Sequence, residues 1–452
     1  MCCISSKINH KNNEFLGDME RIKFVILLCT GTMILLMGCQ TEEAVEDELP
    51  DVKAFTNLTL YDGTDAEPID GVIVIEEGEV LSAGEAGVVQ PPERADIYDL
   101  EGAFVMPGFI NSHGHVGVTD GLNYGSEYYT RENILDVLNT YASYGVTTIV
   151  SLGDLGFEGT DIRDEQYNDD LTRSRLYVSG PVIDADSPED AVEQVNEAAE
   201  NEVDWIKIRI DDQLGQGEKM PPEVYEAVIE TADEHGLEVA AHIVEREDAV
   251  DVIEAGATVI AHSVRDRAAD YTLVRAMQEN DICYIPTLTR ELSTFVYQDR
   301  PDFFDDPFFQ RGVSSDVIAE LESDESQQQY RESEAAEYFE EQLPLAKENL
   351  ESIHESAVDI AMGTDSGMPA RFPGFFEHKE MEMMQEAGLD PMDILHSATG
   401  MAAECMGLEN TGVLETGSKA DFIAFEDDPT EDITNTRSLM GVWIAGNEIA
   451  ID

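Results

Sequence analysis

Basic residues are scarce in this chain of 452 residues. Lys and Arg together number 26, against 96 Asp and Glu, so the formal net charge is −70 at pH 7. A field of this sign repels nucleic acids and anionic membranes, and we therefore expect no nucleic-acid partner. The acidic residues are spread over the whole chain instead of forming one acidic tail. This distribution favours a surface adapted to high salt, where screening weakens the self-repulsion.

Cysteine is also rare, with six in the chain. Beyond the N-terminal region only Cys283 and Cys405 remain, and two residues do not make a disulfide framework. Cys283 lies in the apolar run Ile-Cys-Tyr-Ile, so we expect it to be a buried thiol.

The apolar run 24–37 is too short to span a bilayer comfortably. It follows a basic start, Met19-Glu-Arg-Ile-Lys, and ends in Leu36-Met-Gly-Cys39, which resembles the lipobox of bacterial lipoproteins. This resemblance implies lipidation of Cys39 and an extracytoplasmic protein anchored to the membrane of the cell envelope. An ordinary signal peptide and a short buried helix are the alternatives.

Short apolar runs alternate with helical patterns through the middle of the chain. Eight of these runs are typical of buried strands: 105–110, 147–151, 176–179, 205–210, 239–242, 258–262, 282–286 and 359–363. Continuous apolar runs indicate strands that are covered on both faces, as in a parallel sheet. The pattern predicts a (β/α)₈ barrel, an α/β fold, with a doubly wound open sheet as the alternative.

Short strands separated by turns occur at both ends of this region, and neither set is long enough for a core of its own. We expect them to form one small β-sandwich domain. The expected layout is an upstream extension (1–18), a lipoprotein signal peptide (19–39), an acidic tether (40–51), the first part of the β-sandwich (52–105), the barrel (106–408) and the second part of the β-sandwich (409–452).

The connection between the last two expected barrel strands is unusually long, covering residues 287–356. An insertion of this length is commonly a lid or a binding loop. Its aromatic residues are Phe295, Tyr297, Phe303, Phe304, Phe308 and Phe309. Packing of these rings against the barrel wall is an equally good interpretation.

Side chains that bind metal ions stand at the ends of the expected barrel strands. They are His113, His115, Lys207, His242, His262 and Asp365. Parallel strands put their C-terminal ends at one mouth, so these residues can converge there. Alternate residues of a strand face the same side, which lets His113 and His115 bind one ion. Imidazole nitrogens suit zinc and its neighbours.

Lys207 is an unusual member of this set, because a protonated amine is repelled by metal ions. Burial and nearby cations lower the pKa of a lysine toward the neutral amine. A neutral amine can capture carbon dioxide as a carbamate, which offers two oxygens and can bridge two ions. The alternative is a structural lysine that pairs with Asp211 or Asp212.

Together these motifs resemble the amidohydrolase superfamily, and within it the imidazolonepropionase-like and prolidase-like members. The matching segments are Val105-Met-Pro-Gly-Phe-Ile-Asn-Ser-His-Gly-His115, Ile206-Lys-Ile, His242, His262, Gly363-Thr-Asp-Ser366 and Gly412-Val-Leu-Glu-Thr-Gly-Ser-Lys-Ala-Asp421. The resemblance implies a barrel with a β-sandwich and two divalent metal ions, with zinc expected and manganese or iron possible.

By position in the resembling motifs, His113, His115 and Asp365 would bind the more buried metal ion, and His242 and His262 the other. The Lys207 carbamate would bridge the two ions. The implied reaction is hydrolysis of an amide, dipeptide-like or cyclic amide bond by a hydroxide between the metal ions. Asp365 would shuttle the proton.

Two other functions are open at this point. The segment His242-Ile-Val-Glu245 matches the pattern of deaminases in the same superfamily, in which a Glu works beside a single metal ion. A surface lipoprotein that only binds its ligand is the second alternative. Glu245 can instead begin the next helix, where a carboxylate complements the helix dipole.

Substrate contacts are expected from residues that follow the last strands, because guanidinium groups suit a substrate carboxylate. The candidates are Arg265, Arg290, Arg371 and His378. Salt bridges to the many local acids are the alternative. The expected ligand is a small amide or dipeptide, and the sequence leaves a homo-oligomer open.

The charge balance predicts that stability depends on salt. Screening of the net charge of −70 should raise the melting temperature of the protein by roughly 5 °C or more between 0.1 M and 2 M KCl. Thermal melts followed by circular dichroism at the two salt concentrations measure this shift. Equal melting temperatures would contradict adaptation to high salt.

Overall fold

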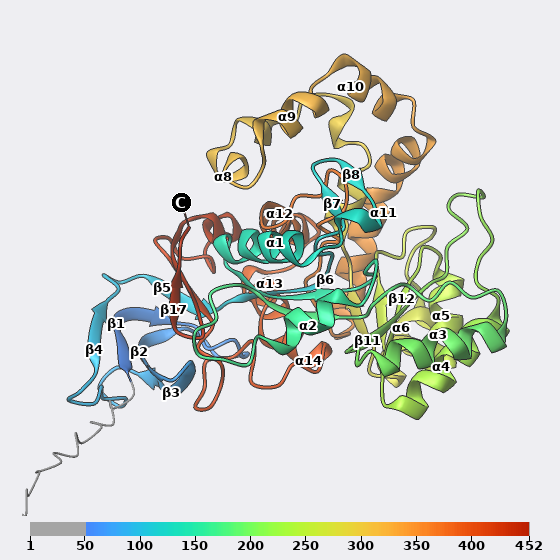
Figure 1. The fold of residues 1–452 in the computed structure, drawn as a ribbon. Coiled ribbons are helices and arrows are strands. Elements are labelled where there is room, and N and C mark those ends of the chain that lie inside the picture. The colour runs from blue at the N-terminus through green and yellow to red at the C-terminus, as the bar shows by residue number, and fades with distance from the viewer. Residues whose placement is uncertain (1–50, 452) are drawn as a thin grey trace, which may run out of the picture. The chain divides into compact units, whose positions relative to one another are not determined.

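The computed structural model describes residues 51–451 (Figure 1). The expected upstream extension, signal peptide and lipidation site at Cys39 lie outside the described residues, as does nearly all of the acidic tether. Within the described part of the chain, no helix is both long and apolar enough to cross a lipid bilayer.

The middle of the chain forms the predicted barrel. Its regular strands are β6 (Phe109–Gly114), β9 (Val146–Ser151), β10 (Arg175–Val178), β11 (Trp205–Arg209), β12 (Glu238–His242), β13 (Val259–Ala261) and β14 (Cys283–Ile285). They pair in parallel as β6-β9-β10 and β11-β12-β13-β14, and a bridge from Ile183 to Ile208 joins the two groups. The prediction of a barrel is confirmed.

The eighth barrel position is filled by residues 359–366, which form single bridges instead of a regular strand. Tyr284 N donates to Asp359 O at 2.9 Å on one side, and Ser112 N donates to Met362 O at 2.9 Å on the other. Gly363 is required here, because a Cβ at this position would lie 2.5 Å from Ile285 Cγ2 and 2.9 Å from His113 N. This segment closes the barrel onto β6.

The expected first barrel strand, 105–110, is corrected by the structure. It is two strands in two different sheets, because β5 (Phe104–Pro107) pairs with the terminal strands and β6 begins at Phe109. Pro107 has no N–H group to continue a ladder. Gly108 then lets the chain pass close to β9, since a Cβ there would lie 2.1 Å from Thr147 Oγ1.

Strands from both ends of the described chain form one mixed sheet, as predicted. Its members are β1 (Val52–Leu60), β2 (Ile69–Glu76), β3 (Glu79–Glu85), β4 (Asp96–Asp99), β5, β15 (Phe422–Phe425), β16 (Leu439–Ile444) and β17 (Asn447–Ile449). The two ends meet where β15 pairs antiparallel with β5. Phe55, Phe422 and Trp443 pack there, with ring centroids 4.8 to 5.4 Å apart.

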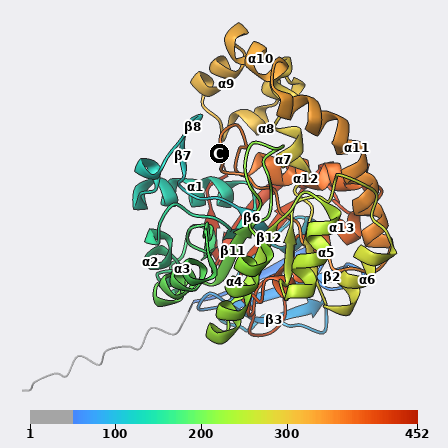
Figure 2. The ribbon, with the colours of Figure 1, turned by 90° about the vertical axis from the view of Figure 1, so that its right-hand side faces the viewer.

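Helices connect the barrel strands and surround them (Figures 1 and 2). They are α1 (Arg131–Ser143), α2 (Glu158–Asp164), α3 (Pro188–Glu200), α4 (Pro222–His235), α5 (Arg246–Ala255), α6 (Tyr271–Glu279), α12 (Phe375–Glu386), α13 (Pro391–Ser397) and α14 (Gly400–Cys405). Local sequence fixes their ends. Ser187 caps α3 with Pro188 at its first position, for example, and Gly236 ends α4 in the left-handed conformation.

The long connection after β14 is helical. It contains α7 (Leu288–Leu292), α8 (Pro307–Gln310), α9 (Ser315–Leu321), α10 (Asp324–Arg331) and α11 (Glu334–Glu355), and α8 to α10 lie above the barrel in Figure 1. Tyr297, Phe304 and Phe309 are buried against Phe375 and Phe376 of α12. The aromatic residues therefore pack as a small core of their own. Between this insertion and the barrel is a cleft of about 690 Å³.

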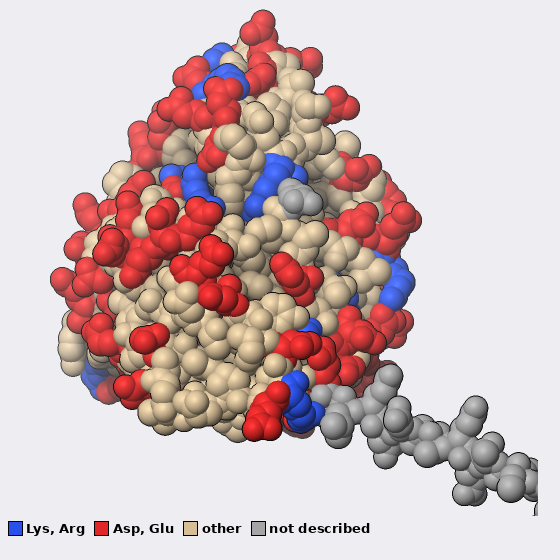
Figure 3. Space-filling view, turned by 90° about the vertical axis from the view of Figure 1, so that its left-hand side faces the viewer, with Lys and Arg blue, Asp and Glu red and all other residues tan. Residues whose placement is uncertain are grey.

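Acidic residues outnumber basic ones on the face that Figure 3 shows. Asp and Glu are distributed over much of this face, with fewer Lys and Arg among them, and its lower middle is largely uncharged. This agrees with the even spread of acidic residues along the sequence.

Cys283 is not the free buried thiol that its apolar setting suggested. It forms a disulfide with Cys405, which lies 122 residues later in the chain. The bond joins β14 to α14. Sequence spacing could not reveal this pair, because the barrel brings together two segments that are distant along the chain.

The disulfide should stabilise the domain by constraining the unfolded chain. We expect Cys405→Ser to lower the free energy of unfolding by about 2–4 kcal/mol. Guanidinium denaturation of the oxidised wild type and the variant measures the difference. Dithiothreitol should destabilise the wild type and leave Cys283→Ser unchanged, and equal sensitivity of the two proteins would contradict the assignment.

Candidate metal centre

All of the candidate ligands from the sequence lie at the C-terminal mouth of the barrel. His113 and His115 are at the end of β6, Lys207 is on β11, and His242 ends β12. His262 directly follows β13, and Asp365 belongs to the closing segment. Three residues of the mouth have a positive φ: 74° at His262 directly after β13, 48° at Thr287 shortly after β14, and 60° at Asp365 in the closing segment. Strained backbone of this kind clusters at functional sites.

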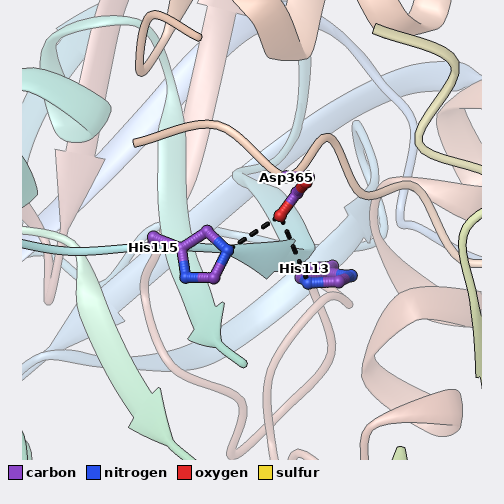
Figure 4. A group of neighbouring side chains, drawn as sticks. All are labelled: His113, His115 and Asp365. Carbon is purple, nitrogen blue, oxygen red and sulfur yellow. Dashed lines mark hydrogen bonds and ion pairs between the residues drawn. The ribbon is translucent and has the colours of Figure 1, made fainter. Parts of the chain in front are cut away.

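One half of the site consists of His113, His115 and Asp365. Asp365 Oδ1 lies 2.8 Å from His115 Nε2 and 3.5 Å from His113 Nε2 (Figure 4). One ligand atom from each residue lies within 4.8 Å of the others, and all three side chains are buried. Two imidazoles and a carboxylate at these separations can hold one divalent cation.

The other half consists of His242 and His262, whose ring centroids are 4.2 Å apart. The His262 ring is also 4.7 Å from that of His113, so the two halves adjoin. His262 Nδ1 lies 2.8 Å from Thr287 Oγ1, which orients the ring and leaves Nε2 for a ligand. His242 Nε2 lies 3.4 Å from Asp211 Oδ2.

Electrostatics keep the imidazoles of His113, His242 and His262 in the form that binds metal ions. Burial lowers the pKa of His113 and His262 well below the ordinary value and that of His242 to about 3. Burial opposes ionisation of Asp365, but Arg371 and the two histidines outweigh it and hold the pKa of Asp365 well below its usual range. The site therefore offers the neutral imidazoles of His113, His242 and His262 and an ionised carboxylate at neutral pH.

Lys207 has the properties that the sequence interpretation requires of it. Burial lowers its pKa to about 7, so a large fraction of the amine is neutral at neutral pH. Its Nζ has no hydrogen-bond partner among the described residues, and its charge acts on His113, His242 and Asp365. The alternative pairing with Asp211 or Asp212 is not formed within the described chain.

A buried carboxylate that no sequence pattern predicted supports the first half of the site. Glu377 Oε1 accepts hydrogen bonds from Asn111 Nδ2 at 2.6 Å, Thr364 Oγ1 at 2.8 Å and Ser366 Oγ at 2.5 Å. Its Oε2 accepts from Gly374 N at 2.6 Å. Glu377 thereby ties β6 to the segment that carries Asp365. No local pattern distinguishes Glu377 from the other acids of α12.

Glu380 performs a similar task for the loop after β14. Its two oxygens accept hydrogen bonds from Leu288 N and Thr289 N at 2.6 and 2.7 Å, and from Thr289 Oγ1 at 2.6 Å. Burial raises the pKa of Glu380 to about 7. The contacts fix the loop that presents Thr287 to His262.

The arginines that we proposed from the sequence occupy three different environments. Arg371 pairs with Asp365 Oδ2, and its Nε donates to Ser293 Oγ at 3.1 Å. Arg290 is 12% exposed and pairs with Glu291. Arg265 is fully buried behind Glu291, so it lies out of reach of a substrate in the mouth.

His378 is corrected from a candidate substrate contact to a packing residue. Its Nδ1 lies 2.9 Å from Thr436 Oγ1 and its Nε2 lies 2.9 Å from Tyr144 O. The ring is fully buried against Phe109 and Phe308. Both nitrogens are occupied, which leaves none for a substrate.

Glu245, the residue on which the deaminase alternative depends, stands at the N-cap position of α5. Its Oε1 lies 2.8 Å from Lys219 Nζ, and Lys219 also binds Asp248 at 2.7 Å. The Glu245 carboxylate thus forms an ion pair with a lysine outside the histidine cluster.

A model of the amidohydrolase family matches residues 104–449. The chain belongs to the amidohydrolase family. The resemblance to this family, which the strand-end motifs indicated, is thus confirmed. Membership of the family implies a divalent metal ion. The Nζ of Lys207 fits this requirement, because it is buried without a hydrogen-bond partner among the described residues, and such an atom is costly to bury without a ligand.

Individual relatives differ in their chemistry. The amidohydrolase chain is 27% identical over 224 residues to an enamidase of Eubacterium barkeri, a match that covers 44% of this chain and 55% of the enamidase. The chain thus spans about half the length of that relative. It is 23% identical over 386 residues to a 5-methylthioadenosine/S-adenosylhomocysteine deaminase of Shouchella clausii (strain KSM-K16), covering 78% of this chain and 80% of the deaminase.

A solved structure supports the fold of this amidohydrolase. A Bifidobacterium longum protein assigned as a prolidase superimposes with a TM-score of 0.71 at 24% identity, covering 88% of this chain and 94% of that protein. At this identity the likeness establishes the common architecture of barrel and β-sandwich.

The Glu377 network predicts a measurable loss of stability. The two carboxylate oxygens of Glu377 accept hydrogen bonds from four donors. Glu377→Gln replaces one of these oxygens by an NH₂ group, which cannot accept, so we expect the free energy of unfolding to fall by about 1–3 kcal/mol. Metal affinity should fall as well. Urea denaturation and metal titration of the variant test this, with exposed Glu332→Gln as the control. Wild-type behaviour in both assays would contradict the role.

Proposed function

We propose that this protein is a metal-dependent hydrolase that cleaves an amide, dipeptide-like or cyclic amide bond of a small molecule. The observation that supports this best is the convergence of His113, His115 and Asp365 with their ligand atoms within 4.8 Å of one another. His242, His262 and the neutral amine of Lys207 adjoin this group. Family membership agrees with carbon–nitrogen bond hydrolysis.

Two divalent ions, zinc in the first place and manganese or iron as alternatives, are proposed as cofactors. His113, His115 and Asp365 would hold the first, and His242 and His262 the second. Lys207, as a carbamate formed with carbon dioxide, would serve both. Its buried and unpartnered Nζ supports this role. Bound divalent ions would supply an acidified water and a polarised substrate carbonyl.

The side chains of the site then have separate tasks. The Asp365 carboxylate is ionised at neutral pH, so it can accept a proton from the attacking water and pass it to the leaving nitrogen. Arg371 holds the Oδ2 side of that carboxylate, while Oδ1 faces the two imidazoles. Thr287 keeps the ring of His262 in its orientation.

Deaminase chemistry is the second candidate function, because the chain is similar to a deaminase over 78% of its length. The pairing of Glu245 with Lys219 supports the two-ion hydrolase instead, as does the Lys207 amine, which has no hydrogen-bond partner in the described part of the chain. A binding-only protein is less well supported, since every candidate ligand predicted from the sequence stands at the mouth.

We also propose that the protein is exported and held at the cell envelope by a lipid on Cys39. The disulfide between Cys283 and Cys405 supports an oxidising compartment, because such bonds are rare in reducing cytosol.

Asp365→Asn tests the proton shuttle. We expect the variant to keep the ion held by His242 and His262, to bind the ion at His113 and His115 more weakly, and to lose about 10²–10⁴-fold in kcat, because the proton shuttle is gone. The assay is a panel of dipeptides, N-acyl amino acids and lactams, with elemental analysis of metal per chain. Two ions per chain and hydrolysis by the wild type are expected. One ion per chain with deamination, or activity equal to wild type in the variant, would overturn the proposal.

A further inference from the structure

The β domain exposes more apolar side chains than the rest of the described chain. Of the eleven large hydrophobic residues that are exposed in the described part, five fall within residues 69–98. Val88, at 73%, and Ile97, at 57%, are the most exposed of these five. Single exposed apolar residues are normal on a protein surface, whereas a concentration of them marks an interaction surface.

Val88 and Ile97 border the same side of the sheet. Residues 86–95 cross this side, where Ala86, Val89 and Ala95 pack on a small core of Val52, Ala54, Val72 and Val74. Ile97 of β4 is the register partner of Ala54 of β1, and paired residues of neighbouring strands point to the same face. Ile97 therefore extends the apolar core outward at the edge of the sheet.

The turn that carries Val88 has a fixed conformation. Val88 N and Val89 N both donate to Glu85 O, at 3.0 and 3.1 Å, and Ala86 N donates to Asp70 O at 2.8 Å. The Val88 side chain is thus exposed on a hydrogen-bonded turn. A surface that is already ordered loses little conformational entropy when a partner covers it.

This side of the β domain is also poor in charge. Residues 86–92 contain no charged side chain, although 27% of the whole chain is Asp, Glu, Lys or Arg. Figure 3 looks at the side on which Figure 1 shows β1 to β4, and the lower middle of that view is largely uncharged. Glu85, Glu93 and Asp96 flank the segment and are exposed. An apolar phase can cover such a segment without desolvating an ion.

The described chain enters the fold at the same place. Val52, the first residue of β1, belongs to the small core that residues 86–95 cover. The residues between Cys39 and Val52 can span at most about 45 Å when fully extended. A lipid on Cys39 would therefore hold the β domain close to a bilayer. A short linker gives an effective concentration of the order of millimolar, so even a weak contact is populated.

We propose that the β-domain face, defined as residues 86–95 with Ile97, rests on the surface of a lipid bilayer. Val88 enters the lipid interface, and the flanking acids stay in water. A zwitterionic bilayer suits this face better than an anionic one, because the chain carries −70. Molar salt shortens the screening length to about 3 Å and so removes repulsion at longer range. This inference rests on the proposed lipid anchor and names the surface that the anchor brings to the membrane.

Tryptophan fluorescence tests the contact on the full chain, purified from membranes and reconstituted with phosphatidylcholine vesicles in 2 M KCl. Val88→Trp places a reporter on the turn, and bromine on the lipid acyl chains quenches a tryptophan that reaches them. Trp205 and Trp443 are buried and give a constant background. Tyr271→Trp is the matched control, because Tyr271 is 77% exposed on α6 of the barrel. Circular dichroism verifies the fold of each variant.

Brominated vesicles should reduce the emission of Val88→Trp by roughly half, because an interfacial apolar face enters about 5–10 Å into the boundary of headgroups and acyl chains. The emission of Tyr271→Trp should not change. Adding Ile97→Asp to Val88→Trp places a charge in the β-domain face and should abolish most of the quenching. Val192→Asp, at an exposed position of α3, is the control for this second substitution and should leave the quenching intact.

Equal emission of Val88→Trp with brominated and unbrominated vesicles would overturn the inference, and so would quenching that Ile97→Asp leaves unchanged. A blue shift of Val88→Trp emission that grows with protein concentration in the absence of vesicles would also overturn it, because a second copy of the chain then covers the face. Mass spectrometry of the lipid on Cys39 and flotation with vesicles report the anchor separately. Flotation without quenching refutes the face alone, and quenching without a lipid on Cys39 refutes the anchor alone.

Discussion

The backbone contact between the first barrel strand and the closing segment is the constraint on which the site depends. Thr364 N and Asp365 N donate to His113 O at 3.0 and 2.7 Å, and His115 N donates to Ser366 O at 2.8 Å. These bonds bring a carboxylate from residue 365 to two imidazoles some 250 residues earlier. Gly363 makes the approach possible, and Glu377 holds the same two segments together through their side chains.

The charge of the mouth contrasts with the charge of the surface. The chain as a whole carries −70, whereas at the mouth Arg265, Arg290 and Arg371 lie among the carboxylates of Asp211, Glu291 and Asp365. A strongly acidic exterior repels anions at long range, but salt screens that field within roughly a nanometre. Contacts inside the low-dielectric mouth are screened far less.

The insertion after β14 forms one side of the site. Its first helix begins beside the histidine-orienting Thr287 and carries Arg290 and Glu291, and its last helix supplies Phe339 beneath the guanidinium groups. Aromatic packing on α12 anchors the part between them. Arg311 fastens this part further, because its Nη2 donates to Ser143 O at 2.8 Å and its guanidinium lies 4.0 Å from the Tyr144 ring centroid.

The sequence by itself determined the barrel, the shared β domain and the group of strand-end ligands, because parallel strands place their C-terminal ends at one mouth whatever the loops do. The prediction that 105–110 is one strand was wrong, because an apolar run does not reveal a change of sheet at Pro107. The Cys283–Cys405 bond, the Glu377 network and the burial of Arg265 and His378 were decided by tertiary structure alone. Each depends on a partner brought close by folding, and one acid among 96 carries no local sign of such a partner.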